Sequence, residues 1–225
     1  MTGSAGKRED ALRGLEDGRR AQDSTIPAPL TARRLSQAIS EGDGISVVVE
    51  IDGPEAARAA DEAGAEALLV AGRAVRYVEA IREVTELPLV FAVRDGEELQ
   101  VPDGVDACVV SLRERDRDRL DEIRGLASDT CELAILIAND DDLEFVLAEL
   151  DPEILVLGAS GDEDEGRVAG VLDLLPDVPA GKLAIADVDA RTRDDVVSLE
   201  RAGFDGVLVR VGSVAALVGA APPEV

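Results

Sequence analysis

The stretch KLAIADVDARTRDDVVSLERAGFDGVLVRVGS, residues 182–213, decides the fold. Residues 183–188 and 206–211 form two short, mainly apolar runs, as expected of parallel strands that are buried on both faces. Between these runs, apolar residues recur at helical spacing over residues 192–202, which predicts an amphipathic helix. A single strand–helix–strand unit cannot bury both faces of its strands, so the unit should recur along the chain.

The unit does recur. Four segments place an acid shortly before an apolar run, namely AGAEALLV (63–70), DGVDACVV (103–110), LDPEILVL (150–157) and AGFDGVLV (202–209). Four longer apolar runs end on acids, namely ISVVVEID (45–52), LPLVFAVRD (87–95), LAILIAND (133–140) and LAIADVD (183–189). Interleaved, these segments give eight strands, each separated from the next by room for a helix and short loops. The pattern predicts a closed (β/α)8 barrel, the TIM-barrel fold, with short βα loops.

The chain is expected to form one domain with an extension. Residues 45–225 account for the barrel, and residues 1–44 form an N-terminal helical extension. Within this extension, residues 8–22 predict one helix, and residues 31–39 predict another that begins at a Thr31 cap. The extension is expected either to act as a lid over the barrel mouth or to plug or cover the barrel wall.

Two of the expected barrel helices are unusual. The helix after the second strand should follow it directly, over residues 74–84. Residues 96–104, after the third strand, leave room for hardly one helical turn, so this unit should lack a proper helix. The first barrel helix should begin at Pro54, since proline is favoured in the first turn.

The charge of the chain excludes two classes of partner. It has 48 Asp and Glu residues against 23 Lys and Arg residues, a net charge of -25, which disfavours nucleic acid and anionic membrane surfaces. Lysine occurs only at Lys7 and Lys182. This acid-rich, lysine-poor composition resembles that of cytosolic proteins from salt-accumulating archaea; the alternative is an unusually acidic protein of an ordinary cell. With no long apolar run and no apolar signal core, the expected location is the cytoplasm.

Histidine is absent, which excludes most histidine-based hydrolases and zinc enzymes. Cys108 lies in a predicted strand and Cys131 just before another, and neither has metal-ligand spacing. We expect both thiols to be reduced and structural.

Candidate catalytic residues lie at the carboxyl ends of the strands, where such barrels build their active sites. Glu50 and Asp187 stand inside apolar strands, where an unpartnered carboxylate is costly. Their strands should be separated around the barrel only by the eighth strand. Asp52 and Asp189, like Asp95 and Asp140, are more simply helix N-caps or turn acids.

A phosphate site is expected after the last strand. Arg210, Gly212 and Ser213 lie where the strand end and the first amides of a short helix bind phosphate in these barrels. Two interpretations of Arg210 remain open: it contacts a phosphate, or it neutralises Glu50 or Asp187 as an ion pair.

Several segments, in order along most of the chain, resemble the indole-3-glycerol-phosphate synthase family, the tryptophan-pathway member of the ribulose-phosphate-binding barrels. They are GISVVVEI (44–51), REVTELPLV (82–90), ELAILIANDDDLE (132–144) and IADVDARTRDDVVSLERAGFDGVLV (185–209). The resemblance implies decarboxylation and ring closure of a carboxyphenylamino deoxyribulose phosphate. It also implies a general-acid lysine after strand three, a second lysine after strand one, three glutamates and an asparagine.

The chain departs from this residue set at most positions. Glu50 matches the strand-one glutamate, and Asp187 replaces the strand-seven glutamate. Asp52 stands in place of the strand-one lysine, Leu136 in place of the strand-five glutamate, and Gly158 in place of the strand-six asparagine.

No lysine replaces the missing general acid. Arg94 is the nearest cation to that position and is our third candidate catalytic residue, although a guanidinium keeps its proton. The long phosphate-gripping loop of the family is reduced to residues 53–54.

Three functional hypotheses follow. The first is a catalytically degenerate barrel that needs no cofactor or metal and binds a phosphorylated small molecule, or acts as a regulatory or scaffold protein with a protein partner or a second copy of itself. The second is an active synthase in which Glu50 and Asp187 transfer protons and Arg94 or Arg210 replaces lysine. The third is a phosphosugar lyase or isomerase with a divalent metal held by the carboxylates that follow strands one and seven, Glu50, Asp52, Asp187 and Asp189.

Overall fold

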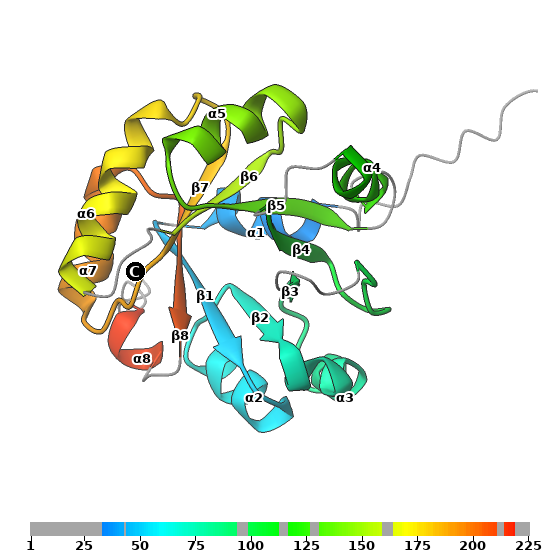
Figure 1. The fold of residues 1–225 in the computed structure, drawn as a ribbon. Helices are drawn as coiled ribbons and strands as arrows, with labels where there is room; N and C mark the ends of the chain where they lie inside the picture. The colour runs from blue at the N-terminus through cyan, green and yellow to red at the C-terminus, as the bar shows by residue number, and fades with distance from the viewer. Residues whose placement is uncertain are drawn as a thin grey trace, which may run out of the picture.

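The computed structural model describes residues 33–42, 44–93, 99–112, 117–126, 131–158, 164–210 and 214–218. Eight parallel strands pair in sequence order and close on themselves, so the fold is a (β/α)8 TIM barrel, as predicted (Figure 1). The strands are β1 (Ser46–Ile51), β2 (Ala67–Ala71), β3 (Leu89–Val93), β4 (Ala107–Ser111), β5 (Glu132–Ile137), β6 (Ile154–Leu157), β7 (Leu183–Asp187) and β8 (Gly206–Arg210).

Helices surround the barrel, and one helix precedes it (Figure 1). They are α1 (Arg34–Glu41), α2 (Pro54–Glu62), η2 (Gly72–Tyr77), α3 (Val78–Arg82), α4 (Arg117–Leu126), α5 (Asp140–Glu149), α6 (Asp164–Leu174), η3 (Leu175–Asp177), α7 (Arg193–Ala202) and α8 (Val214–Leu217). None of the described helices is long and apolar enough to span a lipid bilayer.

Several sequence-based expectations about helices are corrected. The helix expected over residues 74–84 is a 3-10 segment, η2, followed by the short α3, because Gly72 bends the chain directly out of β2 at a φ of 52°. Of the segment 96–104, predicted to lack a proper helix, residues 99–104 are not helical, and residues 96–98 lie outside the described residues. Thr31 lies outside the described residues; α1 begins at Arg34, after an Arg33 that makes no side-chain cap.

Of the four acids predicted to be helix N-caps or turn acids, Asp52, Asp140 and Asp189 do not occupy an N-cap position, and Asp95 lies outside the described residues. Asn139 caps α5 by accepting a hydrogen bond from the Asp142 amide at 3.0 Å. Thr192 caps α7, accepting from the Asp195 amide at 3.2 Å, and hydrogen bonds from the Arg191 and Thr192 amides lower the pKa of Asp195. The caps fall on the extended residue directly before each helix, a position that Asp140 misses by one residue.

The pleat of the strands sorts their side chains into two apolar clusters. One set points outward and packs against the helices, as Val47, Leu68 and Ile135 do. The alternate set fills the barrel interior, as Val48 and Leu69 do. Because side chains alternate with a period of two, the last inward position of a strand lies in the barrel mouth.

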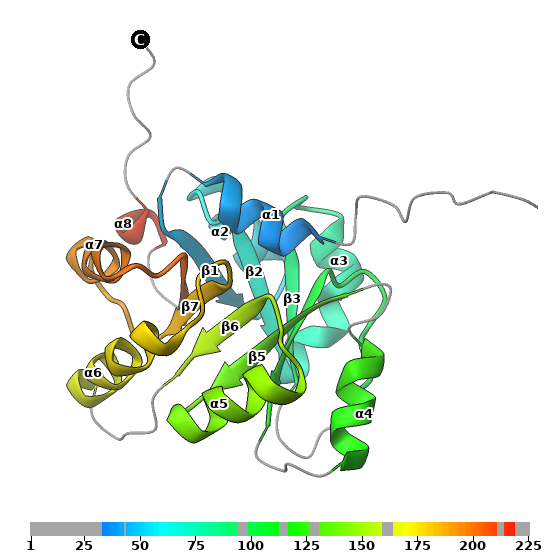
Figure 2. The ribbon, with the colours of Figure 1, turned by 90° about the horizontal axis from the view of Figure 1, so that it is seen from above.

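Helix α1 closes the amino-terminal end of the barrel (Figure 2). Leu35 and Ile39 belong to the interior cluster and are 1% and 4% exposed. Glu132, at the start of β5, accepts hydrogen bonds from the backbone amides of Leu35 at 2.6 Å and Ser36 at 3.1 Å. Within the N-terminal extension, α1 therefore acts as a plug at the end of the barrel opposite the mouth.

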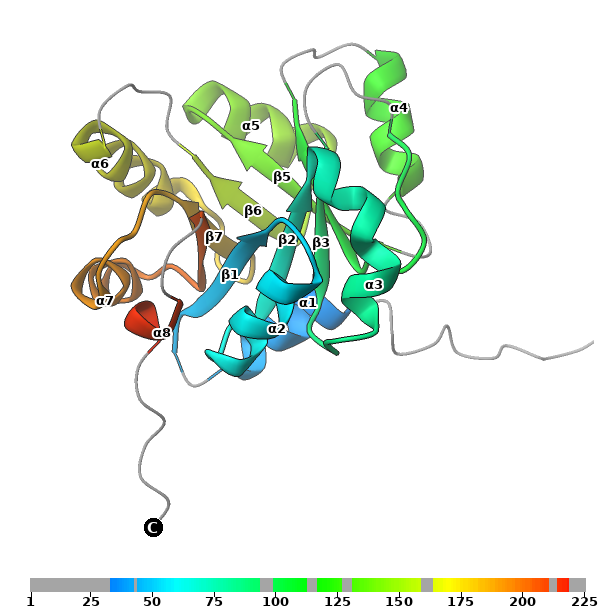
Figure 3. The ribbon, with the colours of Figure 1, turned by 90° about the horizontal axis from the view of Figure 1, so that it is seen from below.

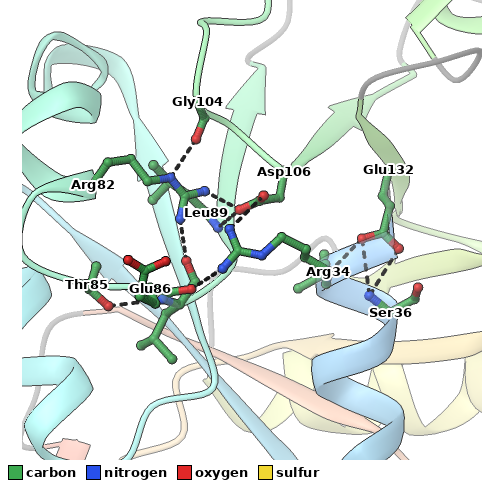
Figure 4. A network of polar contacts seen from close by, with 11 residues as sticks. Arg34, Ser36, Arg82, Thr85, Glu86, Leu89, Gly104, Asp106 and Glu132 are labelled. Carbon is green, nitrogen blue, oxygen red and sulfur yellow. Dashed lines mark hydrogen bonds and ion pairs between the residues drawn. The ribbon is translucent and has the colours of Figure 1, made fainter. Parts of the chain in front are cut away.

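A network of hydrogen bonds and ion pairs between charged side chains holds together the amino-terminal end of the barrel (Figure 4). The Asp106 carboxylate accepts hydrogen bonds from Arg34 Nη1 at 3.1 Å, from the Leu89 amide at 2.8 Å and from Arg82 Nη2. The same guanidinium groups also donate hydrogen bonds to backbone carbonyls, Arg34 to that of Glu86 and Arg82 to that of Gly104. This network joins α1, α3 and the segments that lead into β3 and β4.

Candidate functional site

The carboxyl ends of three neighbouring strands bring two carboxylates and one guanidinium together. β8 lies between β7 and β1 in the closed barrel. Glu50 is the direct partner of Arg210 in the β1–β8 register, and Asp187 ends β7 opposite Leu208. All three ionic side chains line one cavity in the barrel mouth. The strand order thus places Glu50 and Asp187 near each other, with Arg210 between them.

Arg210 contacts both carboxylates. Its Nη2 donates a hydrogen bond to Asp187 Oδ2 at 2.7 Å and lies 2.6 Å from Oδ1, a buried oxygen that has no partner in hydrogen-bond geometry. Its Nε lies 3.6 Å from Glu50 Oε2. The side chains of Asp187, Glu50 and Arg210 are 12%, 28% and 46% exposed. Arg210 is therefore the most exposed side chain of the cluster. Two carboxylates against one guanidinium leave one net negative charge.

The cluster forms one side of a cavity of about 270 Å³. Apart from Ser111 the rest of the lining is apolar, and it includes inward-facing side chains of several strands, namely Leu69, Val109, Leu136, Val156 and Leu208. An apolar cup with a few convergent polar groups is typical of small-molecule sites. The cavity suits a small ligand whose apolar part packs against this wall and whose polar part faces the ionic cluster.

Gly158, directly after β6, lies close to Leu136 and Asp187 of the neighbouring strands. A Cβ atom at this position would lie 3.2 Å from Leu136 Cδ1 and 3.5 Å from Asp187 Oδ2. The Cβ atom of an asparagine here would require Leu136 to shift by a few tenths of an ångström, while its distance from Asp187 is an ordinary van der Waals contact. Gly158 and Leu136 are two of the positions at which the chain differs from the family that it resembles. The two differences are coupled, because the leucine side chain occupies the space beside the glycine.

Three of the residues predicted to form the site, Arg94, Gly212 and Ser213, lie outside the described residues. Lys182, the one lysine among the described residues, lies at the opposite end of the barrel. Its Nζ donates to Asp151 Oδ1 at 2.6 Å and to the Pro152 carbonyl at 2.8 Å. Within the described part of the chain, no lysine lines the cavity.

The four carboxylates of the metal hypothesis do not converge. Asp189 pairs with Arg191 at the rim, through Arg191 Nε at 2.8 Å. Asp52 faces a second cavity outside the barrel wall. Among the residues that the structure describes, no three Cys, Asp or Glu side chains form a group suited to a metal ion.

The second cavity lies between α2 and α8, which flank β1 (Figure 3). Its volume is about 430 Å³, and small apolar residues such as Ala56, Ala60 and Val214 dominate its lining. The polar groups that it contains are the acids Glu50 and Asp52, with no cation among the lining residues. It therefore lacks the convergent, mixed polar groups that the smaller cavity in the mouth presents.

The apolar wall of the mouth, to which Val109, Leu136 and Val156 contribute, is not among the site residues predicted from the sequence. The period-two alternation along each strand is the signal that identifies these inward positions. A scan of the chain against models of known protein families finds no match, and neither does a search of curated proteins.

Proposed function

We propose that this TIM barrel has the ancestry of indole-3-glycerol-phosphate synthase, has lost the ring-closing reaction, and binds a small phosphorylated molecule in its mouth. The ancestry rests on the segments quoted above, which follow the order of the barrel units. A regulatory or scaffold role, with ligand occupancy communicated to a protein partner or a second copy of the chain, is compatible with this activity.

The observation that carries the proposal is the position of Arg210. Among the described residues that line the cavity it is the one cation, and it contacts both carboxylates that would have to transfer protons. A guanidinium keeps its proton at neutral pH and is a poor general acid. Glu50 and Asp187 therefore position the arginine, and the described cavity holds no group suited to protonate a ring-closing carbon.

The same arginine is suited to an anion. Because its Nε and Nη2 contact Glu50 and Asp187, a phosphate would be bound by the remaining N–H donors of the planar guanidinium, and nearly half of the side chain is exposed. The apolar wall opposite offers a surface for the body of the ligand. Gly212 and Ser213, which follow β8 in the sequence, are proposed to complete the phosphate contacts.

The active-synthase hypothesis lacks a proton donor among the described residues, and the metal hypothesis lacks a ligand cluster among them. Neither is favoured by a specific contact. The binding hypothesis relies on Glu50, Asp187 and Arg210, which do lie together in one cavity.

Ligand binding tests the proposal. The probe is the carboxyphenylamino deoxyribulose phosphate with its ketone reduced to an alcohol, which cannot cyclise. Equilibrium dialysis in molar potassium chloride keeps the self-repulsion of this acidic chain screened. We expect the probe to bind at least about tenfold more tightly than its dephosphorylated form, as a charge-assisted hydrogen bond predicts. Equal affinities, or no binding by folded protein, would contradict the proposal.

A further inference from the structure

The only two cysteines of the chain meet on the outer face of the barrel wall, between strands β4 and β5. Cys108 Sγ and Cys131 Sγ are 3.0 Å apart, although both thiols are free. Both residues are buried, Cys108 completely and Cys131 with 8% of its surface exposed. Two sulfur atoms at this separation are in closer contact than ordinary packing requires.

The register between β4 and β5 explains why the two cysteine side chains are in contact. Cys108 lies in β4 and is the register partner of Leu133 in β5. Cys131 stands two residues before Leu133, directly ahead of β5, so the pleat directs it to the same outer face. Both cysteines belong to the outer apolar cluster, which includes Leu120 and Ile123 of α4. The contact is therefore fixed by two paired strands and by packing against a helix.

We propose that Cys108 and Cys131 form a redox pair that closes an intramolecular disulfide when the chain meets a small disulfide compound. The bond would join β4 to the residue that precedes β5 and enclose α4 in a covalent loop. Because the chain holds no other thiol, this is the only disulfide that a single molecule can form.

Cys131 is the thiol that an external reagent can reach. It lines a surface cavity of about 310 Å³ at the amino-terminal end of the barrel, together with Arg33, Glu132, Asp151 and Glu153. Cys108 has no exposed surface, and the hydrogen bond with the Cys131 thiol and burial both raise its pKa well above the ordinary value. Three acids against one arginine make the cavity unfavourable for an anionic reagent, so a neutral disulfide is the suitable reactant.

The exchange takes two steps. The Cys131 thiolate attacks the S–S bond of the reagent, which forms a mixed disulfide and releases one thiol. Cys108 Sγ then attacks Cys131 Sγ and loses its proton, which breaks the mixed disulfide and releases the second thiol. The two cysteines are oxidised, the reagent is reduced, and the two cysteine protons end on the released thiols.

The bond would stiffen the plugged end of the barrel. Cys131 is directly followed by Glu132, whose carboxylate holds the first amides of α1 (Figure 4). A covalent link beside Glu132 limits the opening of α4 and of the segment on which α1 rests. A disulfide that closes a loop of this length should raise the thermal midpoint by about 5–10 °C.

The test uses the full chain in molar potassium chloride with 2-hydroxyethyl disulfide as the neutral reagent. After exposure, free thiols are alkylated in denaturant and the protein is analysed by intact mass and peptide mapping. We expect a monomer that has lost two hydrogen atoms, with a Cys108–Cys131 cross-linked peptide and a higher thermal midpoint than the same protein after reduction. Two free thiols, a stable mixed disulfide or a cross-linked dimer would overturn the proposal.

Two single variants check the order of steps. Cys108→Ser should accumulate the mixed disulfide at Cys131, because the second thiol is missing. Cys131→Ser should stay unmodified, since Cys108 is buried. Modification of Cys108 in folded Cys131→Ser would contradict the assigned order; if either serine variant fails to fold, the mass and midpoint of the wild-type protein still decide the proposal.

Discussion

Asp106→Asn is expected to lower the free energy of unfolding by about 3 kcal/mol, because it removes the charge that two arginines share at the plugged end of the barrel. The carboxylate side chain is 11% exposed and accepts from Arg34, Arg82 and the Leu89 amide. Asparagine keeps the shape and one acceptor oxygen, but its NH₂ group faces a guanidinium that also donates. The partly buried arginines then lose their counter-charge.

The matched control is Asp103→Asn, which changes the net charge equally at an exposed turn position nearby. Urea unfolding followed by circular dichroism, in molar potassium chloride, compares the two variants with the wild-type protein. The control should stay within about 0.5 kcal/mol of wild type. A loss of less than about 1 kcal/mol in Asp106→Asn, similar to that of the control, would show that the network of Figure 4 contributes little to stability.

Arg210→Gln is expected to weaken binding of the phosphorylated probe by about a hundredfold. The variant removes the charge-assisted hydrogen bonds to the phosphate, and it leaves Glu50 and Asp187 without the guanidinium that both contact. Two uncompensated carboxylates would then repel the phosphate as well. The two effects act in the same direction, which is why the expected loss exceeds that of a single hydrogen bond.

Arg191→Gln is the matched control for this variant. Arg191 pairs with Asp189 at the same end of the barrel but does not line the cavity. Its replacement makes the same change in net charge and should alter the dissociation constant by less than about threefold in molar salt. Equal losses in the two variants would indicate a general electrostatic effect and would contradict the assignment of Arg210 to the site.

The barrel could be predicted from sequence because its strands are short, continuous apolar runs at regular spacing. The closed parallel order then placed the ends of strands one, seven and eight together, and with them Glu50, Asp187 and Arg210. Because side chains alternate between the two faces along a strand, the sequence alone shows which residues face the barrel interior and which face the helices. This part of the site follows from topology alone.

The parts that could not be predicted depend on side-chain geometry across the barrel. Asp106 precedes β4 in the sequence like any turn acid, and only the packed structure shows Arg34 reaching it from a helix 72 residues away. The two interpretations of Arg210 were equally compatible with the sequence, since both place the same residue at the same strand end. The contact between Cys108 and Cys131 likewise depends on the β4–β5 register.

The central claim is that the mouth binds a phosphorylated ligand without catalysing ring closure. The most direct measurement is the appearance of indole fluorescence when the folded protein, in molar potassium chloride, receives the carboxyphenylamino deoxyribulose phosphate. We predict no turnover, with the substrate bound and recovered unchanged. Steady turnover that is lost in Glu50→Gln would contradict the claim and show an active synthase with a different proton donor.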